Sequence, residues 1–165
     1  MCGIAGILNV TPAVSGPIPE QALDAMVSAL AHRGPGGEGH HEDSDIALGH
    51  RRLAILDRAG GAQPMAYGDN RYWITYNGEV YNFQALRAEL EGHGHTFTTR
   101  SDTEVVLAAY VHWGEACIGK LRGMFAFALW DSVEKRLFLA RDPVGVKPLY
   151  YAETKDAFYF ASEMK

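Results

Sequence analysis

The chain has 165 residues, about the length of one domain, and its hydrophobic fraction of 47% is typical of a globular protein with a buried core. Its formal net charge of -5 gives no general attraction to phosphate backbones or to anionic membrane surfaces. We therefore expect one globular domain over residues 1–165, with neither a nucleic acid nor a membrane as partner.

The cysteine content and the first residues indicate the compartment. Cys2 and Cys117 are too few for a disulfide framework, and reduced thiols suit the cytoplasm. The first residues lack the basic region and apolar core of a signal peptide, and no apolar run approaches the roughly 18 residues that span a bilayer. We expect a cytoplasmic protein in which Cys117 fills core space.

The apolar periodicity predicts strands and helices that alternate along the first two thirds of the chain. A helix over residues 20–31 follows Pro19, a second begins after Asn82 and ends in the stretch Gly92 to Gly94, and a third begins where Ser101 and Glu104 have the spacing of a capping box. In chain order, the predicted strands are residues 4–8, 46–48, 53–56, 72–76, 96–99, 125–130, 136–140, 149–152 and 158–161.

The last four of these runs determine the expected fold class. Turn-type residues separate them at hairpin-like intervals, which indicates antiparallel pairing and, together with the helices, an α+β fold. The stretch Met124 to Trp130 is apolar on both faces, so at least one sheet must be covered on both sides. The sequence therefore predicts more than two layers.

Cys2 is a candidate nucleophile because it directly follows the initiator methionine. If Met1 is removed, Cys2 carries both a nucleophilic sulfur and an α-amino group whose unperturbed pKa is about 7.7–8.0. Such an amine can accept a proton from the attacking thiol and return it to a leaving amine. By itself a cysteine at this position is more often structural, so the surrounding motifs must show whether Cys2 is a nucleophile.

Nine sequence blocks extend from the first residue to the last: MCGIAGI, HRGP at 32–35, GHRRLAILD at 49–57, QPM at 63–65, YNGEVYN at 76–82, SDTE at 101–104, LRGMFAFALWD at 121–131, RDPVGVKPLYY at 141–151 and ASEMK at 161–165. Together they resemble the glutamine-hydrolysing domain of class II amidotransferases, and within that class the asparagine synthetase family. The resemblance implies an N-terminal-nucleophile hydrolase fold, with two antiparallel sheets between helical layers. It also implies hydrolysis of L-glutamine to glutamate and ammonia.

The resemblance further implies a role for individual residues. Cys2 attacks the side-chain amide of glutamine and forms a thioester, while the Asn77 side chain and the Gly78 N–H stabilise the oxyanion. Arg52 binds the α-carboxylate of glutamine, and Asp102 and the Glu79 region accept hydrogen bonds from its α-ammonium group. Backbone groups of Leu53, Ala54, Ile55 and Leu56 are expected to assist.

The same residues also have structural explanations. Asn77-Gly78 between strand-like runs favours a two-residue hairpin turn. Asp102 lies in the first turn of a helix, where the macrodipole favours a carboxylate. Arg51 and Arg52 together are typical of a solvated charge pair. Asp142 and Lys147 belong to a stretch that resembles a structural loop of the family, and we assign them no chemistry. The histidines lack a ligand cluster, so no metal site is expected.

Two departures from the family pattern remain. Gly36 stands where relatives carry aspartate after HRGP, and no synthetase half follows ASEMK. We expect a truncated chain or a free-standing subunit whose partner is a synthetase domain in cis or in trans. ATP and magnesium are expected only in that domain, and no cofactor in this one. The sequence leaves open a homodimer, a nitrogen acceptor other than aspartate, and a non-catalytic module that binds glutamine or docks a synthetase.

Overall fold

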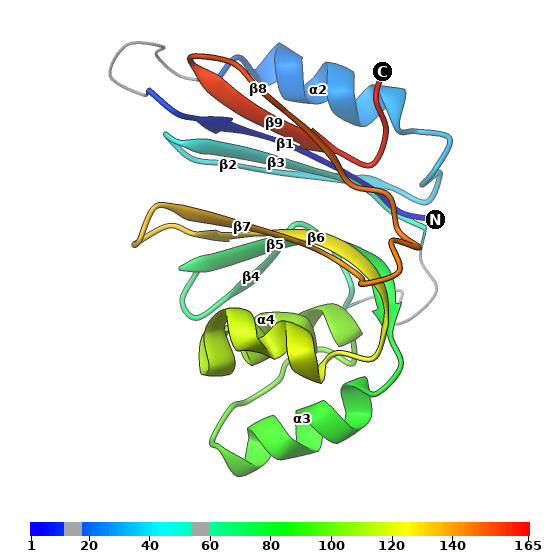
Figure 1. Cartoon of the computed structure of the whole chain (residues 1–165), viewed down its shortest axis with the longest axis vertical. Helices are drawn as coiled ribbons and strands as arrows, with labels where there is room; N and C mark the ends of the chain where they lie inside the picture. The colour runs from blue at the N-terminus through cyan, green and yellow to red at the C-terminus, as the bar shows by residue number, and fades with distance from the viewer. Residues whose placement is uncertain (12–17, 54–59) are drawn as a thin grey trace.

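Two antiparallel sheets lie face to face in the computed structural model, which describes residues 1–11, 18–53 and 60–165 (Figure 1). In chain order the elements are β1 (Gly3–Asn9), α2 (Glu20–Ala29), β2 (Glu38–Glu42), β3 (Ile46–Arg51), β4 (Met65–Tyr67), β5 (Tyr72–Val80), α3 (Phe83–Gly92), α4 (Asp102–Trp113), the 3-10 helix η1 (Gly114–Lys120), β6 (Gly123–Asp131), β7 (Arg136–Arg141), β8 (Tyr150–Glu153) and β9 (Ala157–Ala161).

The five-stranded sheet has the strand order β2-β3-β1-β9-β8, so the first strand of the chain lies at its centre. β1 pairs with β3 from Gly3 opposite Arg51, and with β9 from Ala5 opposite Ala161. The helix α2 covers the outer face through Leu23 and Val27, which pack against the sheet. The helical spacing of these apolar residues therefore explains the position of α2.

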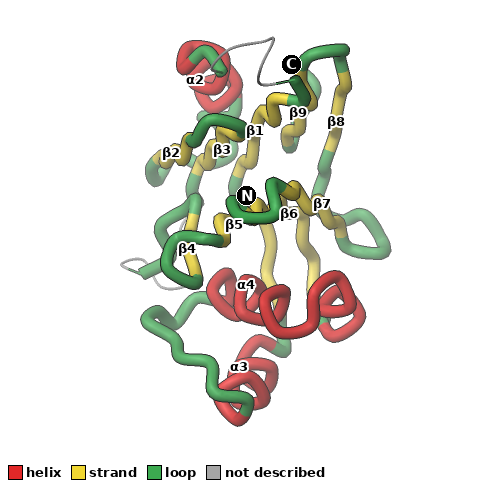
Figure 2. Tube along the Cα trace, turned by 90° about the vertical axis from the view of Figure 1, so that its left-hand side faces the viewer, coloured by secondary structure: helices red, strands yellow, loops and turns green. Residues whose placement is uncertain are grey.

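The four-stranded sheet has the order β4-β5-β6-β7, and its two faces pack against different layers (Figure 2). Phe127 and Leu129 of β6 pack in the core next to α4, whereas Trp130 packs between the two sheets. The helix α4 is buried from Asp102 to Tyr110, and α3 packs against it. The predicted α+β class, the antiparallel pairing and the doubly covered strand are thus confirmed.

Three predicted helices exist, and Cys117 is completely buried in the core, as expected. The capping box is only partly as predicted. The Ser101 hydroxyl accepts a hydrogen bond from the Thr103 N–H, but the Ser101 N–H donates to Thr99 Oγ1 rather than to Glu104.

Of the described helices, none is long and apolar enough to cross a membrane.

Two predictions of local structure are wrong. Residues 96–99 form a loop and not a strand, because the Glu104 carboxylate accepts hydrogen bonds from the backbone and hydroxyl groups of Thr98 and Thr99. Asn77-Gly78 is not a hairpin turn, since both residues lie inside β5 and pair with β6. In the predicted strand over residues 53–56, Leu53 is not in a strand and the other three residues lie outside the described ranges.

Candidate active site

A pocket of about 110 Å³ opens near the amino-terminal end of β1. It brings together every predicted site residue that the structure describes, namely Cys2, Arg52, Leu53, Asn77, Gly78, Glu79 and Asp102. Ala54, Ile55 and Leu56 lie outside the described residues. Residues of β5 and β6, of α4, of the segment after β3 and of the chain start therefore converge on one small volume.

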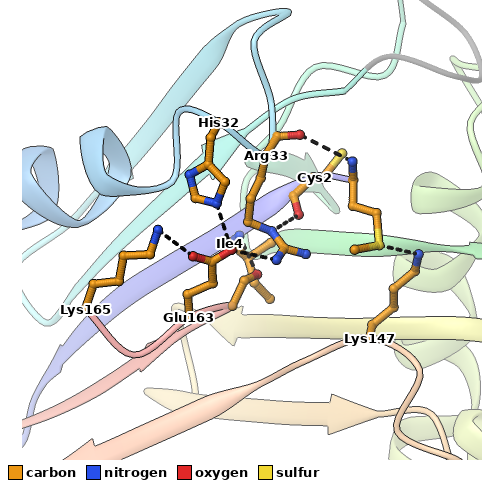
Figure 3. A network of polar contacts seen from close by, with 9 residues as sticks. Cys2, Ile4, His32, Arg33, Lys147, Glu163 and Lys165 are labelled. Carbon is orange, nitrogen blue, oxygen red and sulfur yellow. Dashed lines mark hydrogen bonds and ion pairs between the residues drawn. The ribbon is translucent and has the colours of Figure 1, made fainter.

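The backbone of Cys2 is fixed by Arg33 (Figure 3). Arg33 Nε donates a hydrogen bond to the Cys2 carbonyl at 3.0 Å, and Arg33 also forms an ion pair of 2.9 Å with Glu163. Hydrogen bonds from Lys165 and Arg33 lower the pKa of Glu163 to about 2, so this carboxylate stays charged. Residues from HRGP and ASEMK thus hold the first residues of the chain in place.

The thiol of Cys2 lies beside Leu53, whose N–H donates to Sγ at 3.3 Å. In this structure the nitrogen of Cys2 belongs to the peptide bond with Met1. The Met1 amino group donates to the Arg33 carbonyl at 3.3 Å, and its thioether accepts a hydrogen bond from Lys147 Nζ at 3.4 Å. Met1 and Lys147 both line the pocket, so the initiator residue occupies part of the candidate site.

Asn77 and Gly78 lie in the middle of β5, next to β6. Asn77 is buried, and its Nδ2 has no hydrogen-bond partner in the described part of the chain. A Cβ atom on Gly78 would lie 2.6 Å from the Met124 carbonyl oxygen and 2.8 Å from Phe125 Cα, so only glycine allows the two strands to approach this closely. A buried amide donor that lacks a partner among the described residues therefore belongs to a residue that lines the pocket.

Asp102 connects α4 to β5 and also lines the pocket. Its Oδ2 accepts hydrogen bonds from the Tyr76 hydroxyl at 2.7 Å and from the Val80 N–H at 3.0 Å. Burial raises the pKa of Asp102, although these hydrogen bonds oppose the shift. Burial and the Asp102 charge raise the pKa of Tyr76 well above its ordinary value. The carboxylate thus has a structural partner in addition to its position at the helix start.

Arg51 and Arg52 are not a solvated pair, because the two side chains have different surroundings. Arg52 lines the pocket, and its backbone N–H and carbonyl bond to Gly37 and Gly36 of the preceding loop. Arg51 instead forms an ion pair of 2.7 Å with Glu38. The loop that contains Gly36 is therefore anchored to the backbone of the pocket arginine, despite the departure from the family pattern.

His50 lies behind this arginine and was not predicted as part of the site. Its Nδ1 is 3.2 Å from Thr75 Oγ1, and because that hydroxyl donates to the Gly49 carbonyl, His50 must donate to it. Burial, with the charge of Arg52, lowers the pKa of His50 to about 3. His50 is therefore a neutral imidazole that packs next to a cationic site residue.

Several other residues that line the pocket were missed by the sequence reasoning, among them Gln63, Tyr76, Thr103, Met124 and Lys147. Gln63 accepts a hydrogen bond from the Tyr76 N–H at 2.6 Å and donates to Thr103 at 3.4 Å. Each of these residues belongs to one of the nine blocks, which is the signal that would have found them. Within the described ranges, no three His, Cys, Asp or Glu side chains are arranged to hold a metal ion.

A family model described as a glutamine amidotransferase domain matches residues 1–165. The chain belongs to the glutamine amidotransferase domain family. This amidotransferase domain is 48% identical over 165 residues to asparagine synthetase [glutamine-hydrolyzing] 1 of Bacillus subtilis strain 168, and 42% identical over 167 residues to a probable asparagine synthetase of Dictyostelium discoideum. Both matches cover the whole chain but only 26% and 30% of the relatives, so the chain spans less than a third of their length.

Solved structures have the same fold. The amidotransferase domain is similar to glutamine phosphoribosylpyrophosphate amidotransferase from B. subtilis, with a TM-score of 0.78 and 25% identity over 98% of this chain and 42% of that chain. A second similar structure, described as the allosteric regulatory enzyme of purine biosynthesis, has a TM-score of 0.76 and 26% identity, with the same coverage. The predicted N-terminal-nucleophile sandwich is therefore confirmed.

Proposed function

We propose that this domain hydrolyses L-glutamine to glutamate and ammonia, with Cys2 as the nucleophile after removal of Met1. The observation that carries the proposal is the convergence, in one pocket, of the Cys2 thiol and the buried, unpartnered amide nitrogen of Asn77. A thiol supplies the attacking atom, and a free donor fixed nearby supplies a partner for the charge that forms during attack.

The reaction follows from these groups. The Cys2 sulfur forms a bond to the side-chain carbonyl carbon of glutamine while its proton passes to the α-amine. Asn77 Nδ2 and the Gly78 N–H bind the oxyanion of the tetrahedral intermediate. The C–N bond then breaks, the amine returns the proton to the leaving nitrogen, and water hydrolyses the resulting thioester.

The pocket also contains groups that suit a free amino acid. Arg52 can bind the α-carboxylate of glutamine through two parallel hydrogen bonds, and the Leu53 backbone lies next to the nucleophile. Asp102 and Glu79 supply acceptors for the α-ammonium group. Opposite charges at the two ends select glutamine over a plain amide.

The ammonia is proposed to serve a synthetase domain that converts aspartate to asparagine. The relatives named above are glutamine-hydrolysing asparagine synthetases more than three times as long as this chain, which supports a synthetase domain in cis. ATP and magnesium would act in that domain, whereas this domain needs no cofactor. Because ammonia becomes mostly ammonium in neutral water, the proposal includes internal delivery. We place the enzyme in the cytoplasm, where both thiols stay reduced.

Intact mass and an ammonia-release assay test the proposal on the chain as it stands. We expect a mass without Met1, release of ammonia from glutamine, and a single adduct with an electrophilic glutamine analogue. Cys2→Ala should abolish both activity and adduct, whereas Cys117→Ala should keep both. Activity that survives in Cys2→Ala would contradict the nucleophile assignment. Glutamine binding without hydrolysis, on a chain that retains Met1, would favour the non-catalytic module.

A further inference from the structure

Lys147 is a buried cation without a matching anion. Its residue is only 6% exposed and lines the candidate active site. Within the part of the chain that the structure describes, its one side-chain hydrogen bond goes to the Met1 thioether at 3.4 Å, and no carboxylate lies within ion-pair distance. A thioether sulfur is a weak acceptor, and burying an ammonium group beside it is unfavourable. Such a position favours a functional role over a structural one.

Hydrogen bonds within the loop after β7 hold the backbone of Lys147 in place. The Asp142 carboxylate accepts hydrogen bonds from the N–H groups of Val146 at 2.9 Å and Lys147 at 3.0 Å, and also from the Phe125 N–H of β6. Arg141 Nε donates to the Lys147 carbonyl at 2.7 Å. Asp142 is therefore the structural residue of this loop, whereas the side chain of Lys147 reaches from it into the pocket.

Met1 connects Lys147 to the backbone of Cys2, because its thioether accepts the Lys147 hydrogen bond and its carbonyl carbon forms the peptide bond with the Cys2 nitrogen. Its removal does two things at once. It takes away the sulfur atom that Lys147 contacts, and it converts the Cys2 nitrogen from an amide into an amine. In the processed enzyme we expect the Lys147 ammonium group and the new amine to border the space that Met1 occupied.

Other charges surround the same chain end. The groups that face it from the neighbouring elements are Arg33 before β2, Arg52 after β3, Glu79 on β5, Tyr76 on β5, Asp102 on α4 and Glu163 after β9. The charge of Arg33 is balanced by its ion pair with Glu163, and the Asp102 carboxylate is bound by Tyr76. Lys147 has no such counter-charge within ion-pair distance among the described residues.

We propose that Lys147 is a positioning residue for the glutaminase reaction, whose ammonium group repels a second positive charge at the chain end and so keeps the Cys2 α-amine in its neutral, proton-accepting form. The inference rests on the proposed function, since it assigns the amine as the base. A like charge in the same pocket disfavours protonation of an amine. The amine is then ready to take the thiol proton at neutral pH.

Two variants and two measurements test the role. Lys147→Met keeps the length and apolar stem but removes the charge, and Lys147→Arg is the matched control that keeps it. We expect the acidic limb of the kcat/KM profile, measured from about pH 5.5 to about pH 9.5, to move up by about one pH unit in Lys147→Met. Its kcat/KM should fall about tenfold near pH 6.5 and stay near the wild-type value near pH 9, whereas Lys147→Arg should follow the wild type.

A titration of the amine itself separates this inference from the proposed function. In protein labelled with ¹⁵N-cysteine, the Cys2 nitrogen is an amine after Met1 removal, whereas the Cys117 nitrogen is an amide and serves as internal reference. The amine should titrate at higher pH in Lys147→Met than in the wild type. Equal midpoints would overturn the role of Lys147, whatever the activity. A shifted midpoint in a protein that does not release ammonia would overturn the glutaminase proposal alone, and an amide signal from a retained Met1 would overturn both.

Discussion

The side-chain amide of Asn77 is held in the pocket by a strand rather than by a turn, and its nitrogen has no partner in the described ranges. If this nitrogen binds the oxyanion, Asn77→Ala should lower kcat by about 10²–10³ with little change in KM, since the interaction exists only in the transition state. Steady-state kinetics with glutamine measure both constants. A kcat within a few-fold of wild type would remove Asn77 from the oxyanion site.

The two adjacent arginines offer a matched comparison of substrate binding. Arg52 lines the pocket, whereas Arg51 contacts Glu38 and the Val27 carbonyl. Arg52→Ala should raise KM for glutamine about 10- to 100-fold, because a charged hydrogen-bonded pair contributes about 1.5–3 kcal/mol. Arg51→Ala should leave KM nearly unchanged. Similar KM values in the two variants would count against a carboxylate site at Arg52.

His50, which lies next to the candidate site, is expected to make the free energy of unfolding depend on pH in acid. Its pKa is about 3 in the folded protein, well below the ordinary 6.5. Between these two values the unfolded chain binds a proton that the folded protein excludes, so the free energy of unfolding falls as pH drops from 6.5 toward 3.

Replacement of this imidazole isolates the effect. His50→Asn keeps a donor toward Thr75 but does not titrate, so urea unfolding of this variant should depend less on pH below about 6.5. Val133→Ala, at an exposed position after β6, changes no titratable group, serves as control and should keep the wild-type slope. An identical slope in His50→Asn and wild type would show that His50 does not cause the acid sensitivity.

The Glu104 carboxylate joins the first turn of α4 to the loop that precedes the helix. Glu104 is buried and accepts four hydrogen bonds of 2.7 to 3.0 Å from Thr98 and Thr99. Burial raises the pKa of Glu104, but these bonds outweigh it and lower the pKa overall. The loop over residues 96–99 is therefore fixed to the helix that carries Asp102.

Glu104→Ala should lower the free energy of unfolding by about 2–3 kcal/mol, because it leaves buried donors without acceptors. Glu89→Ala, which removes only an exposed ion pair with Lys120, should cost less than about 1 kcal/mol. Urea denaturation of both variants checks the difference. Equal losses in the two variants would mean that the loop contacts contribute no more than a surface ion pair.

Strands and helices with a clear pattern of apolar residues could be predicted from the sequence. β1, β6 and the three helices carry apolar patterns, and the structure has all of them. β2 has no such pattern, because its residues Glu38–Glu42 are at least partly exposed at the sheet edge and its position is set by pairing with β3. The 96–99 segment has strand-forming residues, but its backbone bonds to Glu104, which a local pattern does not reveal.

The same distinction holds for the candidate site. Cys2, Arg52, Asn77, Gly78, Glu79 and Asp102 were predicted through resemblance, and the structure places them in one pocket, while their roles stay predictions. Lys147 lies in one of the nine blocks, but its proposed role could not be predicted from that block, because the role depends on proximity to Met1, 146 positions away in the sequence. Long-range proximity is a property of the fold and not of any segment.

At the scale of the whole molecule, the two ends of the chain are joined at the site. β1 pairs with β9, and Glu163 holds Arg33, which in turn binds the Cys2 carbonyl. Glu163→Ala should therefore lower kcat about tenfold, with KM changed less, since a small displacement of the nucleophile slows attack. Glu153→Ala on the exposed strand β8 is the control and should match wild type in the same assay. A wild-type kcat in Glu163→Ala would show that Cys2 needs no support from the last residues.

The central position of β1 has a consequence for biosynthesis. Cys2 precedes Lys147, β9 and Glu163 by more than 140 residues in the sequence, although all three lie close to the start of β1 in the fold. An incomplete nascent chain thus has a reactive thiol but no assembled pocket around it. If the proposed glutaminase activity needs the whole pocket, that activity can begin only after β9 has been synthesised.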